Sequence, residues 1–424
     1  MRGPRPFRMF LIVILALTPL AQYFWLVRAW HLIDELTWPG LRYLAQSLWM
    51  AAVLVVLATV LDLMAGHTIP RRDLWPWGRA VARLWLIASC IGYLAATAVG
   101  GIEWLSRPAL AAIPVALRAR VEPAQRTAFR YATYLAGGLP VLVTAYGCTA
   151  GRLRYRLVTV EVPLTELPPG LDGLRIVQLS DLHIGDFMPR AAIRRAVALA
   201  NTVQADLAVL TGDLISHGRD PLEDCLAELS QLRAPLGIWG CHGNHERSAG
   251  VEARAQALFQ RYGMHVLRQQ CVELSWHGGR FNLIGVDDQR GRPGTGEPSS
   301  MLRGLETLVR QDIPNILLSH NPNTFKRAAA LGIELSLAGH THGGQIRFAL
   351  GNRQWSPARF ITPFVAGLYR LPLGHEAHTT GAEVTPRRPK SAFLYVNRGL
   401  GTFGLPVRLG VPPEITVLTL RAVG

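Results

Sequence analysis

Cysteine is scarce in this chain, and its few cysteines show no cross-linking pattern. The 424 residues include five cysteines, and no two of them form a C-x-x-C pair. An odd, unpatterned set argues against a disulfide framework, and zinc-finger spacing is absent. The composition therefore fits a reducing compartment. The five are Cys90, Cys148, Cys225, Cys241 and Cys271.

Charged residues are also few. They make up 17% of the chain, whereas hydrophobic residues make up 49%, which is apolar for a soluble protein. Acidic residues are the scarcer kind, with 29 Asp and Glu against 44 Lys and Arg, so the net charge is +15. Such a balance suits contact with nucleic acid, with an anionic membrane surface or with phosphorylated substrates.

Residues 1–150 are predicted to form a membrane domain with four transmembrane helices. Each of four apolar stretches has about 18–22 residues, which is long enough to span the hydrocarbon core. Tryptophans near the ends of these stretches are typical of a membrane–water interface. Before the fourth stretch, Pro108–Val121 is expected to form an interfacial amphipathic helix. The four stretches are Phe10–Val27, Tyr43–Leu63, Leu84–Leu105 and Ala128–Cys148.

The arginines of the loops predict an orientation. With four spans, one side of the membrane carries about ten loop arginines and the other about six, and the richer side is expected to be cytoplasmic. The chain is thus predicted to be a multi-pass protein of the inner (plasma) membrane, with residues 151–424 in the cytoplasm. The ten are Arg2, Arg5, Arg8, Arg71, Arg72, Arg79, Arg83, Arg152, Arg154 and Arg156.

Residues 151–424 are predicted to form a second domain, because apolar strands and amphipathic helices alternate there. This alternation indicates an α/β layered domain with added antiparallel strands. The polar regions Arg290–Ser299 and Gly374–Lys390 are expected to be mobile loops. Strands are expected at Leu157–Val162, Leu174–Leu179, Leu207–Leu210, Gly237–Cys241, Val272–Trp276, Phe281–Val286, Ile316–Leu318 and Leu335–Ala338. Helices are expected at Pro189–Val203, Leu222–Leu232, Val251–Tyr262, Met301–Val309 and Thr324–Leu331.

Five of the predicted strands are followed by residues that can bind metal. Sites form beyond the carboxyl ends of strands in open α/β sheets, and residues two apart in an extended segment point to the same side. Each residue alone is more often a turn or a hydrogen-bonded core residue, but unrelated turns would not produce this joint placement. Seven carboxylate, amide and imidazole groups can hold two ions such as Mn, Fe or Zn, with one carboxylate shared. They are Asp181, His183, Asp213, Asn244, His320, His340 and His342.

The order D-x-H, G-D, G-N-H-E, a lone His and G-H-x-H resembles the calcineurin-like metallophosphoesterase family. The segment GHTHGGQ and the tail NRGLGTFGLPVRLGVPPEITVLTL are similar to its bacterial membrane-associated branch, the YkuE/YaeI-type phosphoesterases. That branch typically carries one membrane or signal segment, so four spans depart from its pattern. The resemblance implies a two-sheet β-sandwich flanked by helices, with two divalent metal ions, manganese being favoured.

The resemblance also implies roles for individual residues. Asp181, His183 and His342 would hold one ion, Asn244, His320 and His340 the other, and Asp213 would bridge them. Asn244 and His245 would contact the substrate phosphate, and His245 would protonate the leaving group. A water between two cations has a lowered pKa and becomes a nucleophile near neutral pH. Glu246 would either orient His245 or cap the following helix.

These features favour a membrane-anchored hydrolase of phosphodiester or pyrophosphate bonds. A lipid-linked substrate such as UDP-2,3-diacylglucosamine is one candidate. A nuclease or cyclic-nucleotide phosphodiesterase is an alternative, although much of the arginine lies beside the membrane stretches, which disfavours nucleic acid. A non-catalytic metal-binding module is a third reading. Arg347, Arg398 and Arg408 are interpreted as surface charges, with binding of substrate phosphate as the alternative.

Overall fold

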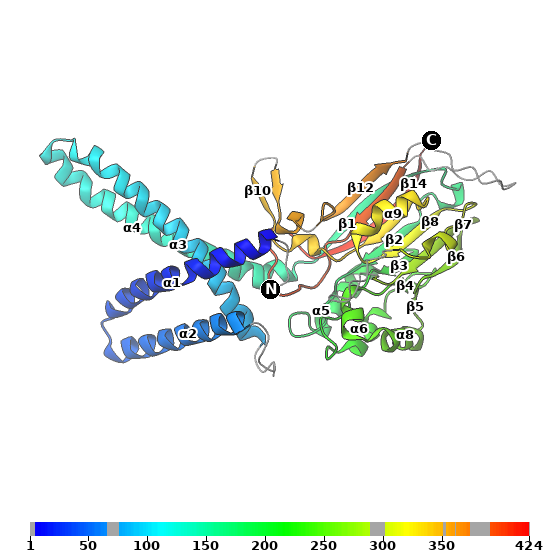
Figure 1. Ribbon diagram of the computed structural model, residues 1–424, viewed down its shortest axis with the longest axis horizontal. Helices are drawn as coiled ribbons and strands as arrows, with labels where there is room; N and C mark the ends of the chain where they lie inside the picture. Colours follow the sequence, from blue (N-terminus) through cyan, green and yellow to red (C-terminus); the bar gives the residue numbers. More distant parts are fainter. Residues whose placement is uncertain are drawn as a thin grey trace. The chain divides into compact units, whose positions relative to one another are not determined.

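The computed structural model describes residues 5–65, 76–288, 302–350, 353–360, 362–373 and 391–423. The chain divides into two compact units, Met1–Cys148 and Thr149–Gly424, which are described separately (Figure 1). The two regions expected to be mobile loops lie outside the described residues, as do Arg2, Arg71 and Arg72.

The described residues of the first unit form four long helices. Within the described residues, three helices are long and apolar enough to cross a membrane, and the fourth is not among them. Four transmembrane helices are therefore not confirmed. Tyrosines, glycines and a proline in the last apolar stretch dilute its hydropathy. The helices are α1 (Arg5–Asp34), α2 (Pro39–Ala65), α3 (Pro76–Ala111) and α4 (Val115–Tyr146).

The separate helix expected at Pro108–Val121 is wrong. Helix α3 continues through Pro108 to Ala111, and α4 begins at Val115, so this segment contains the turn between two long helices. Pro114 immediately precedes α4 with an extended backbone, at φ −56° and ψ 142°. Its ring removes the backbone N–H that a continuous helix would need.

Helices α1, α3 and α4 approach closely at a pair of glycines. A Cβ atom on Gly92 of α3 would lie 2.4 Å from the carbonyl oxygen of Gly137 of α4. The Trp25 ring of α1 covers this crossing and donates a hydrogen bond from Nε1 to the Ser89 carbonyl at 3.0 Å. Small residues allow such close helix contacts in membranes.

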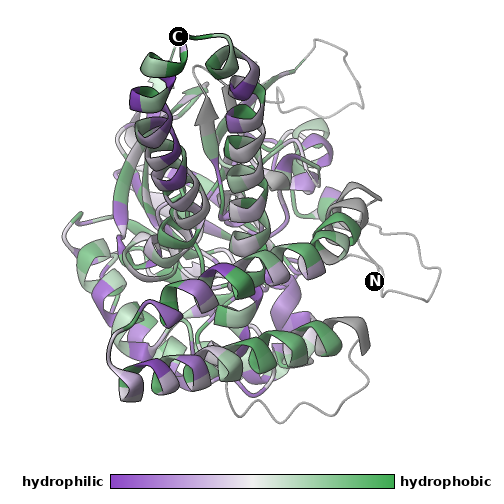
Figure 2. Ribbon diagram, turned by 90° about the vertical axis from the view of Figure 1, so that its left-hand side faces the viewer, coloured by the Kyte–Doolittle hydropathy of each residue, from purple (hydrophilic) through white to green (hydrophobic). Residues whose placement is uncertain are grey.

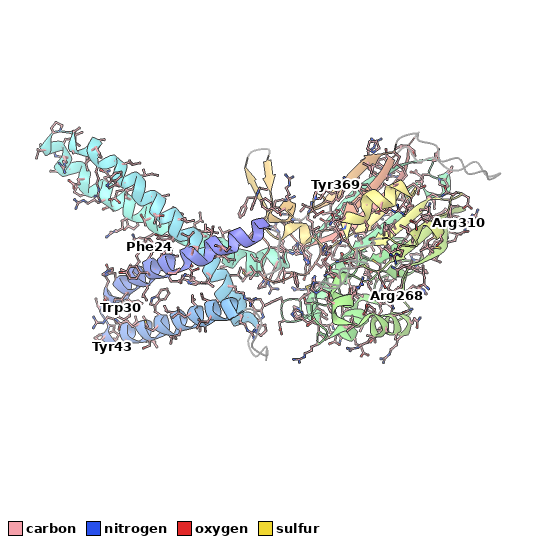
Figure 3. The ribbon with its side chains drawn as sticks, in the orientation of Figure 1. Phe24, Trp30, Tyr43, Arg268, Arg310 and Tyr369 are labelled. Carbon is pink, nitrogen blue, oxygen red and sulfur yellow. The ribbon has the colours of Figure 1, made fainter. Side chains whose placement is uncertain are left out.

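Helices α1 and α2 expose many large hydrophobic side chains. Large hydrophobic side chains are exposed along α2, including Leu48, Leu54 and Leu61, and hydrophobic residues line much of α1 and α2 in Figure 2. Trp30 and Tyr43 lie near the end of the pair where α1 connects to α2 (Figure 3). Exposed aliphatic residues with aromatic residues near a helix end are typical of a bilayer-embedded pair.

The second unit is a sandwich of two six-stranded mixed sheets. Their strand orders are β1-β14-β2-β3-β4-β5 and β12-β13-β9-β8-β7-β6. The first contains β1 (Arg156–Thr165), β2 (Arg175–Leu179), β3 (Leu207–Leu210), β4 (Ile238–Gly240), β5 (His265–Val266) and β14 (Glu414–Val423). The second contains β6 (Gln270–Trp276), β7 (Gly279–Val286), β8 (Asn315–Ser319), β9 (Leu335–Ala338), β12 (Gly367–Pro372) and β13 (Ser391–Val396). A separate hairpin pairs β10 (Phe348–Leu350) with β11 (Arg353–Trp355).

Both faces of the central strands are buried, which explains their continuous apolar sequences. In β2, Ile176 contributes to the core between the sheets, whereas Val177 and Leu179 pack in the cluster on the outer face. Helices α5 (Arg190–Asn201), α6 (Leu222–Leu229) and α8 (Glu252–Arg261) supply that outer cluster. Helix α9 (Phe325–Ala330) packs on the second sheet. The predicted fold class, an α-helical apolar region followed by an α/β two-sheet domain flanked by helices, is confirmed.

One predicted helix of this unit is wrong. Instead of a helix over Met301–Val309, the described part holds only the 3-10 turn η3 (Leu305–Thr307). Gly304 precedes it in the left-handed region, with φ +78°, which interrupts helical geometry.

Strand direction places the candidate site. Strands β2, β3 and β4 run parallel, and so do β8 and β9, so the carboxyl ends of each group lie at one edge of its sheet. Gln178 links the two edges, because its Nε2 donates to the Ala338 carbonyl of the other sheet at 3.0 Å.

Candidate metal centre

The loops that follow these five strands bring the predicted ligands together. The Nε2 atom of His342 lies 3.4 Å from Asp181 Oδ1 and 3.1 Å from His183 Nε2. A second contact involves Asp213, whose Oδ2 atom lies 3.0 Å from His320 Nε2. Three groups of carboxylate and imidazole atoms each fall within 4.8 Å: Asp181, His183 and His342; His183, Asp213 and His245; and Asp213, His320 and His340.

The expectation that the D-x-H segment is extended is wrong. Asp181 and His183 have φ of +51° and +49°, so the segment turns at each of them. Three further candidate ligands, Asp213, His340 and His342, also have positive φ. This conformation costs about 1–2 kcal/mol for each non-glycine residue and persists only where the surroundings enforce it. Such concentrated strain is typical of a functional site.

Two glycines allow the strand ends to close on these side chains. A Cβ atom on Gly243 would lie 2.1 Å from Asp213 Oδ1, and one on Gly339 would lie 2.2 Å from Asp181 Oδ2. Any side chain at either position would therefore displace a carboxylate. The glycines of the G-N-H-E and G-H-x-H motifs are required by this close approach.

Hydrogen bonds to the Nδ1 atoms orient the imidazole rings. His320 Nδ1 lies 2.6 Å from the Thr211 carbonyl oxygen, and His245 Nδ1 lies 2.9 Å from the Ser216 carbonyl oxygen. A carbonyl can only accept, so both Nδ1 atoms carry hydrogen and donate. Neutral rings of this tautomer have a lone pair on Nε2. Ser216 also contacts His183, whose Nδ1 lies 3.0 Å from its hydroxyl.

The donor set fits divalent metal ions. Asn244 Oδ1 is buried without a hydrogen-bond partner among the described residues. Buried amide oxygens are rarely left unpaired, so an unpaired one between Gly243 and His245, which both contact Asp213, fits an acceptor aimed at a cation. The close approach of the His183 and His342 Nε2 atoms is also explained by two lone pairs that point at one ion. Carboxylate, amide and imidazole ligands together suit Mn, Fe or Zn.

Burial sets the protonation of these groups. It lowers the pKa of His183 to about 3 and, together with the neighbouring His183, lowers the pKa of His342 well below its usual range. Both imidazoles are therefore neutral at pH 7, which is the ligand form. Burial disfavours a charged His320, but the Asp213 carboxylate outweighs it and raises the pKa of His320 to about 10. A cation that binds there would displace a proton.

Glu246 supports the centre through the backbone. Its carboxylate accepts from the backbone N–H of Gly243 at 2.8 Å, which caps the short helix α7 (Asn244–Ala249). It also accepts from the N–H groups of Asp213 at 3.0 Å and Leu214 at 2.7 Å. Among the described residues it makes no hydrogen bond to the His245 ring. The capping interpretation therefore holds, and the carboxylate also fixes the loop that carries Asp213.

Two of the three late arginines, Arg398 and Arg408, are not simple surface charges. Arg408 is fully buried, and its guanidinium donates to the carbonyl oxygens of Gly399 and Gly401. Gly401 in turn donates its N–H to the Asp181 carbonyl at 2.8 Å. Arg398 pairs with the buried Glu414 at 2.5 Å. Arg408 therefore holds the loop that packs on Asp181.

Two residues beside the centre, Phe403 and Gln345, do not stand out in the sequence as site residues. The Phe403 ring lies 4.6 Å from the His245 ring and 5.6 Å from the His183 ring, measured between centroids, and Phe403 is 46% exposed. Gln345 holds it in place: its Nε2 donates to the Phe403 carbonyl and its Oε1 accepts from the Phe403 N–H, both at 2.9 Å. The motif GHTHGGQ contained Gln345, but nothing in the sequence connected it with residue 403.

Comparisons with known proteins agree with this geometry. The model of the calcineurin-like phosphoesterase family matches residues 174–344, which include all seven candidate ligands. The uncharacterized metallophosphoesterase YkuE of Bacillus subtilis (strain 168) is 31% identical over 259 residues, covering 60% of this chain and 82% of that protein. An uncharacterized metallophosphoesterase of Aquifex aeolicus (strain VF5) is 30% identical over 280 residues, covering 64% and 93%. The chain belongs to the calcineurin-like phosphoesterase family.

An animal relative also matches. A transmembrane protein with metallophosphoesterase domain from Bos taurus is 36% identical over 298 residues, which are 67% of this chain. The match spans 62% of that protein's length, and 62% of a Danio rerio protein of the same description. Because bacteria and animals both supply relatives, these matches do not assign the chain to the bacterial branch. Among solved structures, the crystal structure of TT1561 of Thermus thermophilus aligns over 47% of this chain and 94% of its own, with 21% identity and a TM-score of 0.32.

Proposed function

We propose that the chain is a membrane-anchored, metal-dependent phosphoesterase that hydrolyses phosphodiester or pyrophosphate bonds with two divalent ions. The observation that carries the proposal is the convergence of two carboxylates, Asp181 and the buried Asp213, with five imidazoles. One of these imidazoles is His245, whose Nε2 lies 4.0 Å from Asp213 Oδ2. A phosphate that reaches the donor groups would therefore lie beside an imidazole.

The ligands divide between two ions around Asp213. Asp181, His183 and His342 would hold one ion, His320, His340 and Asn244 would hold the other, and Asp213 would contribute to both. The grouping of the carboxylate and imidazole atoms and the unpaired Asn244 Oδ1 support this division. Two divalent cations, with manganese favoured, would neutralise phosphate charge and lower the pKa of water.

His245 is the proton donor to the leaving group. Its side chain is 13% exposed, so its Nε2 can reach a bound substrate while Nδ1 remains bonded to the Ser216 carbonyl. When the ring is protonated, Nε2–H donates to the leaving oxygen, and the ring becomes neutral as the proton transfers. The Ser216 carbonyl stabilises the charged ring beforehand and keeps it in place. Asn244 and His245 together contact the substrate phosphate.

The substrate has an apolar part near the phosphate. The exposed Phe403 ring beside His245 offers a hydrophobic surface where the leaving group would depart. A membrane-anchored enzyme meets lipids more readily than soluble compounds, so a lipid-linked substrate such as UDP-2,3-diacylglucosamine fits both features. Nucleic acid fits less well, since an apolar wall offers no charge to its backbone.

The same proposal covers domains and location. Residues 1–150 form the membrane domain, and residues 151–424 form the catalytic domain. Three candidate spans with exposed apolar side chains support membrane insertion. We place the protein in the inner (plasma) membrane with its catalytic domain in the cytoplasm, on the arginine bias of the loops.

The test is hydrolysis of bis-p-nitrophenyl phosphate and p-nitrophenyl phosphate by the detergent-purified full chain. Wild-type protein should require added divalent metal, and Asp213→Asn and His245→Ala should each lose the activity. His265→Ala is the matched control, because this histidine is exposed on β5 and stacks on Trp239. The substrate ratio distinguishes diester from monoester hydrolysis. A chain that binds no metal and cleaves neither compound would contradict the proposal.

A further inference from the structure

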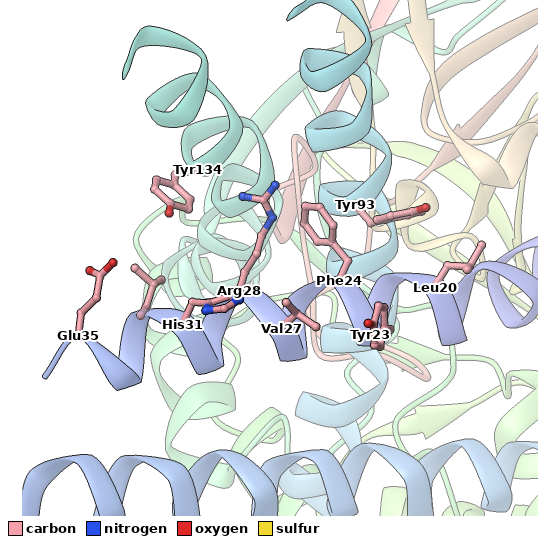
Figure 4. Close-up of a pocket in the computed structure, with 10 residues that line it drawn as sticks. Leu20, Tyr23, Phe24, Val27, Arg28, His31, Glu35, Tyr93 and Tyr134 are labelled. Carbon is pink, nitrogen blue, oxygen red and sulfur yellow. The ribbon is translucent and has the colours of Figure 1, made fainter. Parts of the chain in front are cut away.

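A cavity opens in the first unit where helix α1 diverges from α3 and α4. The three helices are in closest contact at Trp25, Gly92 and Gly137. Beyond this crossing they separate, and the cavity between them has a volume of 540 Å³. Tyr93 of α3 and Tyr134 of α4 line its far side (Figure 4). A cavity of this size suits a ligand or a lipid segment.

The lining changes from apolar to polar along α1. Leu20, Phe24 and Val27 lie at one end. The polar residues Arg28, His31 and Glu35 follow toward the other end, with Leu32 among them. The distance along the helix from Leu20 to Glu35 is about 22 Å. Arg28 is about 9 Å from the end of α1 at Asp34, where a long cationic side chain can reach the membrane surface. An occupant must therefore have an apolar tail and a polar head.

The charge of Arg28 is available to a ligand. Its guanidinium lies 4.4 Å from the centre of the Phe24 ring, and in Figure 4 it extends between Phe24 and Tyr134. No carboxylate pairs with it among the described residues, whereas several other arginines of the chain do form ion pairs. His31 adds a nitrogen donor one turn further on. A phosphate at this position would receive a charge-assisted hydrogen bond.

We propose that this cavity binds an anionic glycerophospholipid of the surrounding membrane. The acyl chain occupies the apolar end, and the phosphate lies at Arg28 and His31. Glu35, one turn beyond His31, accepts from the hydroxyl groups of a headgroup such as glycerol. This site belongs to the membrane unit and does not depend on the proposed hydrolysis.

In a bilayer, the cavity between the helices is expected to be filled by a lipid. A wedge between diverging helices within the hydrocarbon cannot remain empty without losing packing contacts, and water is a poor filler beside leucine and valine. A phospholipid can pack its acyl chain against the apolar residues and pair its phosphate with Arg28. A soluble phosphate could pair with Arg28 but would leave the apolar residues without packing partners.

The test measures lipid binding by the full chain in neutral detergent after delipidation. Native mass spectrometry would count bound phosphatidylglycerol or phosphatidylcholine, and thermal unfolding would follow stabilisation. We expect wild-type protein to bind phosphatidylglycerol more tightly and to be stabilised by it. Arg28→Gln should weaken that binding about fivefold, the effect of one interfacial cation, and remove the preference. Inorganic phosphate at the same concentration should leave the melting temperature unchanged.

Arg42→Gln is the matched control. Arg42 also lies over an aromatic ring, that of Tyr43 at 5.8 Å, but it is outside the cavity. It should retain the preference. Val27→Trp fills the apolar end of the cavity without a change of charge, so it should reduce the binding of both lipids. This variant tests whether lipid occupies the cavity if Arg28→Gln does not fold. Equal binding of both lipids by wild type, an unchanged preference in Arg28→Gln, or equal stabilisation by inorganic phosphate would overturn the proposal. Loss of hydrolytic activity would not affect this result.

Discussion

The Glu246 carboxylate accepts a hydrogen bond from the backbone N–H of Asp213 at 3.0 Å, although the two acidic side chains lie in the same buried region. The carboxylate also accepts from Gly243 and Leu214. It therefore joins the loop after β3 to the loop after β4. The position of the central ligand depends on a residue that our proposal does not include among the metal ligands.

We expect Glu246→Gln to destabilise the fold and to weaken metal binding. A glutamine keeps one acceptor but turns an NH₂ group toward backbone donors, which leaves buried N–H groups unpaired. The expected loss is about 2–4 kcal/mol of unfolding free energy. Thermal unfolding and metal content would measure it. Glu306→Gln is the control, since Glu306 is 45% exposed and should change stability by no more than about 0.5 kcal/mol. Equal behaviour of the two variants would contradict the role of Glu246.

Asn244→Ala should leave one of two ions poorly bound. The buried Oδ1 has no partner in the described structure, so its removal costs few internal hydrogen bonds and the fold should persist. Affinity for one ion should fall by at least about tenfold, because even indirect supports of metal ligands have effects of that size. Elemental analysis after dialysis gives the stoichiometry. Asn201→Ala is the control, because Asn201 makes hydrogen bonds to Gln231 and Arg233 on the surface. Full metal content in Asn244→Ala would exclude the assignment.

Phe403→Ala should reduce kcat/KM for bis-p-nitrophenyl phosphate about three- to tenfold, the range expected for one lost aromatic contact. Metal content should not change, because the ring offers no ligand. Gln345→Leu should have a similar effect, since it removes both hydrogen bonds that hold residue 403. Phe360→Ala is the control: this exposed ring packs on Trp355. If Phe403→Ala behaves like Phe360→Ala, the substrate does not contact this ring.

The ion pairs between α5 and α6 predict a pH dependence of stability. Hydrogen bonds from Arg194, and then from Arg190, lower the pKa of Glu228 from 4.5 to about 2. Because the folded-state pKa is the lower one, the stabilisation is complete above pH 4.5 and is lost as the pH falls toward 2. Both arginines are largely exposed, so we expect only about 1 kcal/mol at pH 7.

Unfolding of Glu228→Gln and wild type at pH 7 and pH 3 would measure this contribution. The difference between the two proteins should shrink at the lower pH. Glu223→Gln is the control, since Glu223 pairs with Arg261 and is 46% exposed. A difference that grows as the pH falls would contradict the sign of the predicted effect.

The sequence identified the candidate ligands because polar residues stand out at the ends of buried strands. It did not predict how they converge: Asp181 and His183 turn through left-handed backbone, which only the packed loops can enforce. Phe403 could not be connected with His245, because a contact between residues so far apart in sequence depends on the complete fold. The same holds for Glu246, whose partners include a loop more than thirty residues earlier.

In the first unit, local apolarity predicted long helices but not their boundaries. The expected helix at Pro108–Val121 included the turn before α4. Apolar residues fill the segment before Pro114, and Arg118 and Arg120 alternate with apolar residues after it, so the composition of the whole segment resembles an amphipathic helix. Nor could composition indicate that Gly92 and Gly137 meet, because contacts between helices are not encoded in the periodicity of either helix alone.

The last prediction concerns this glycine contact. A Cβ on Gly92 would meet the Gly137 carbonyl oxygen at 2.4 Å, and backbone cannot move aside as a flexible side chain can. Gly92→Ala should therefore destabilise the unit by about 1–3 kcal/mol, the usual effect of overpacking. Gly100→Ala is the control on the same helix. Among the described residues, nothing lies within 4 Å of the position that its Cβ would take. The better helix propensity of alanine should therefore leave stability unchanged or raise it by up to about 1 kcal/mol. Thermal unfolding of both variants in detergent separates helix propensity from overpacking. Helix propensity alone would raise both melting temperatures. A close contact between α3 and α4 would lower only the melting temperature of Gly92→Ala.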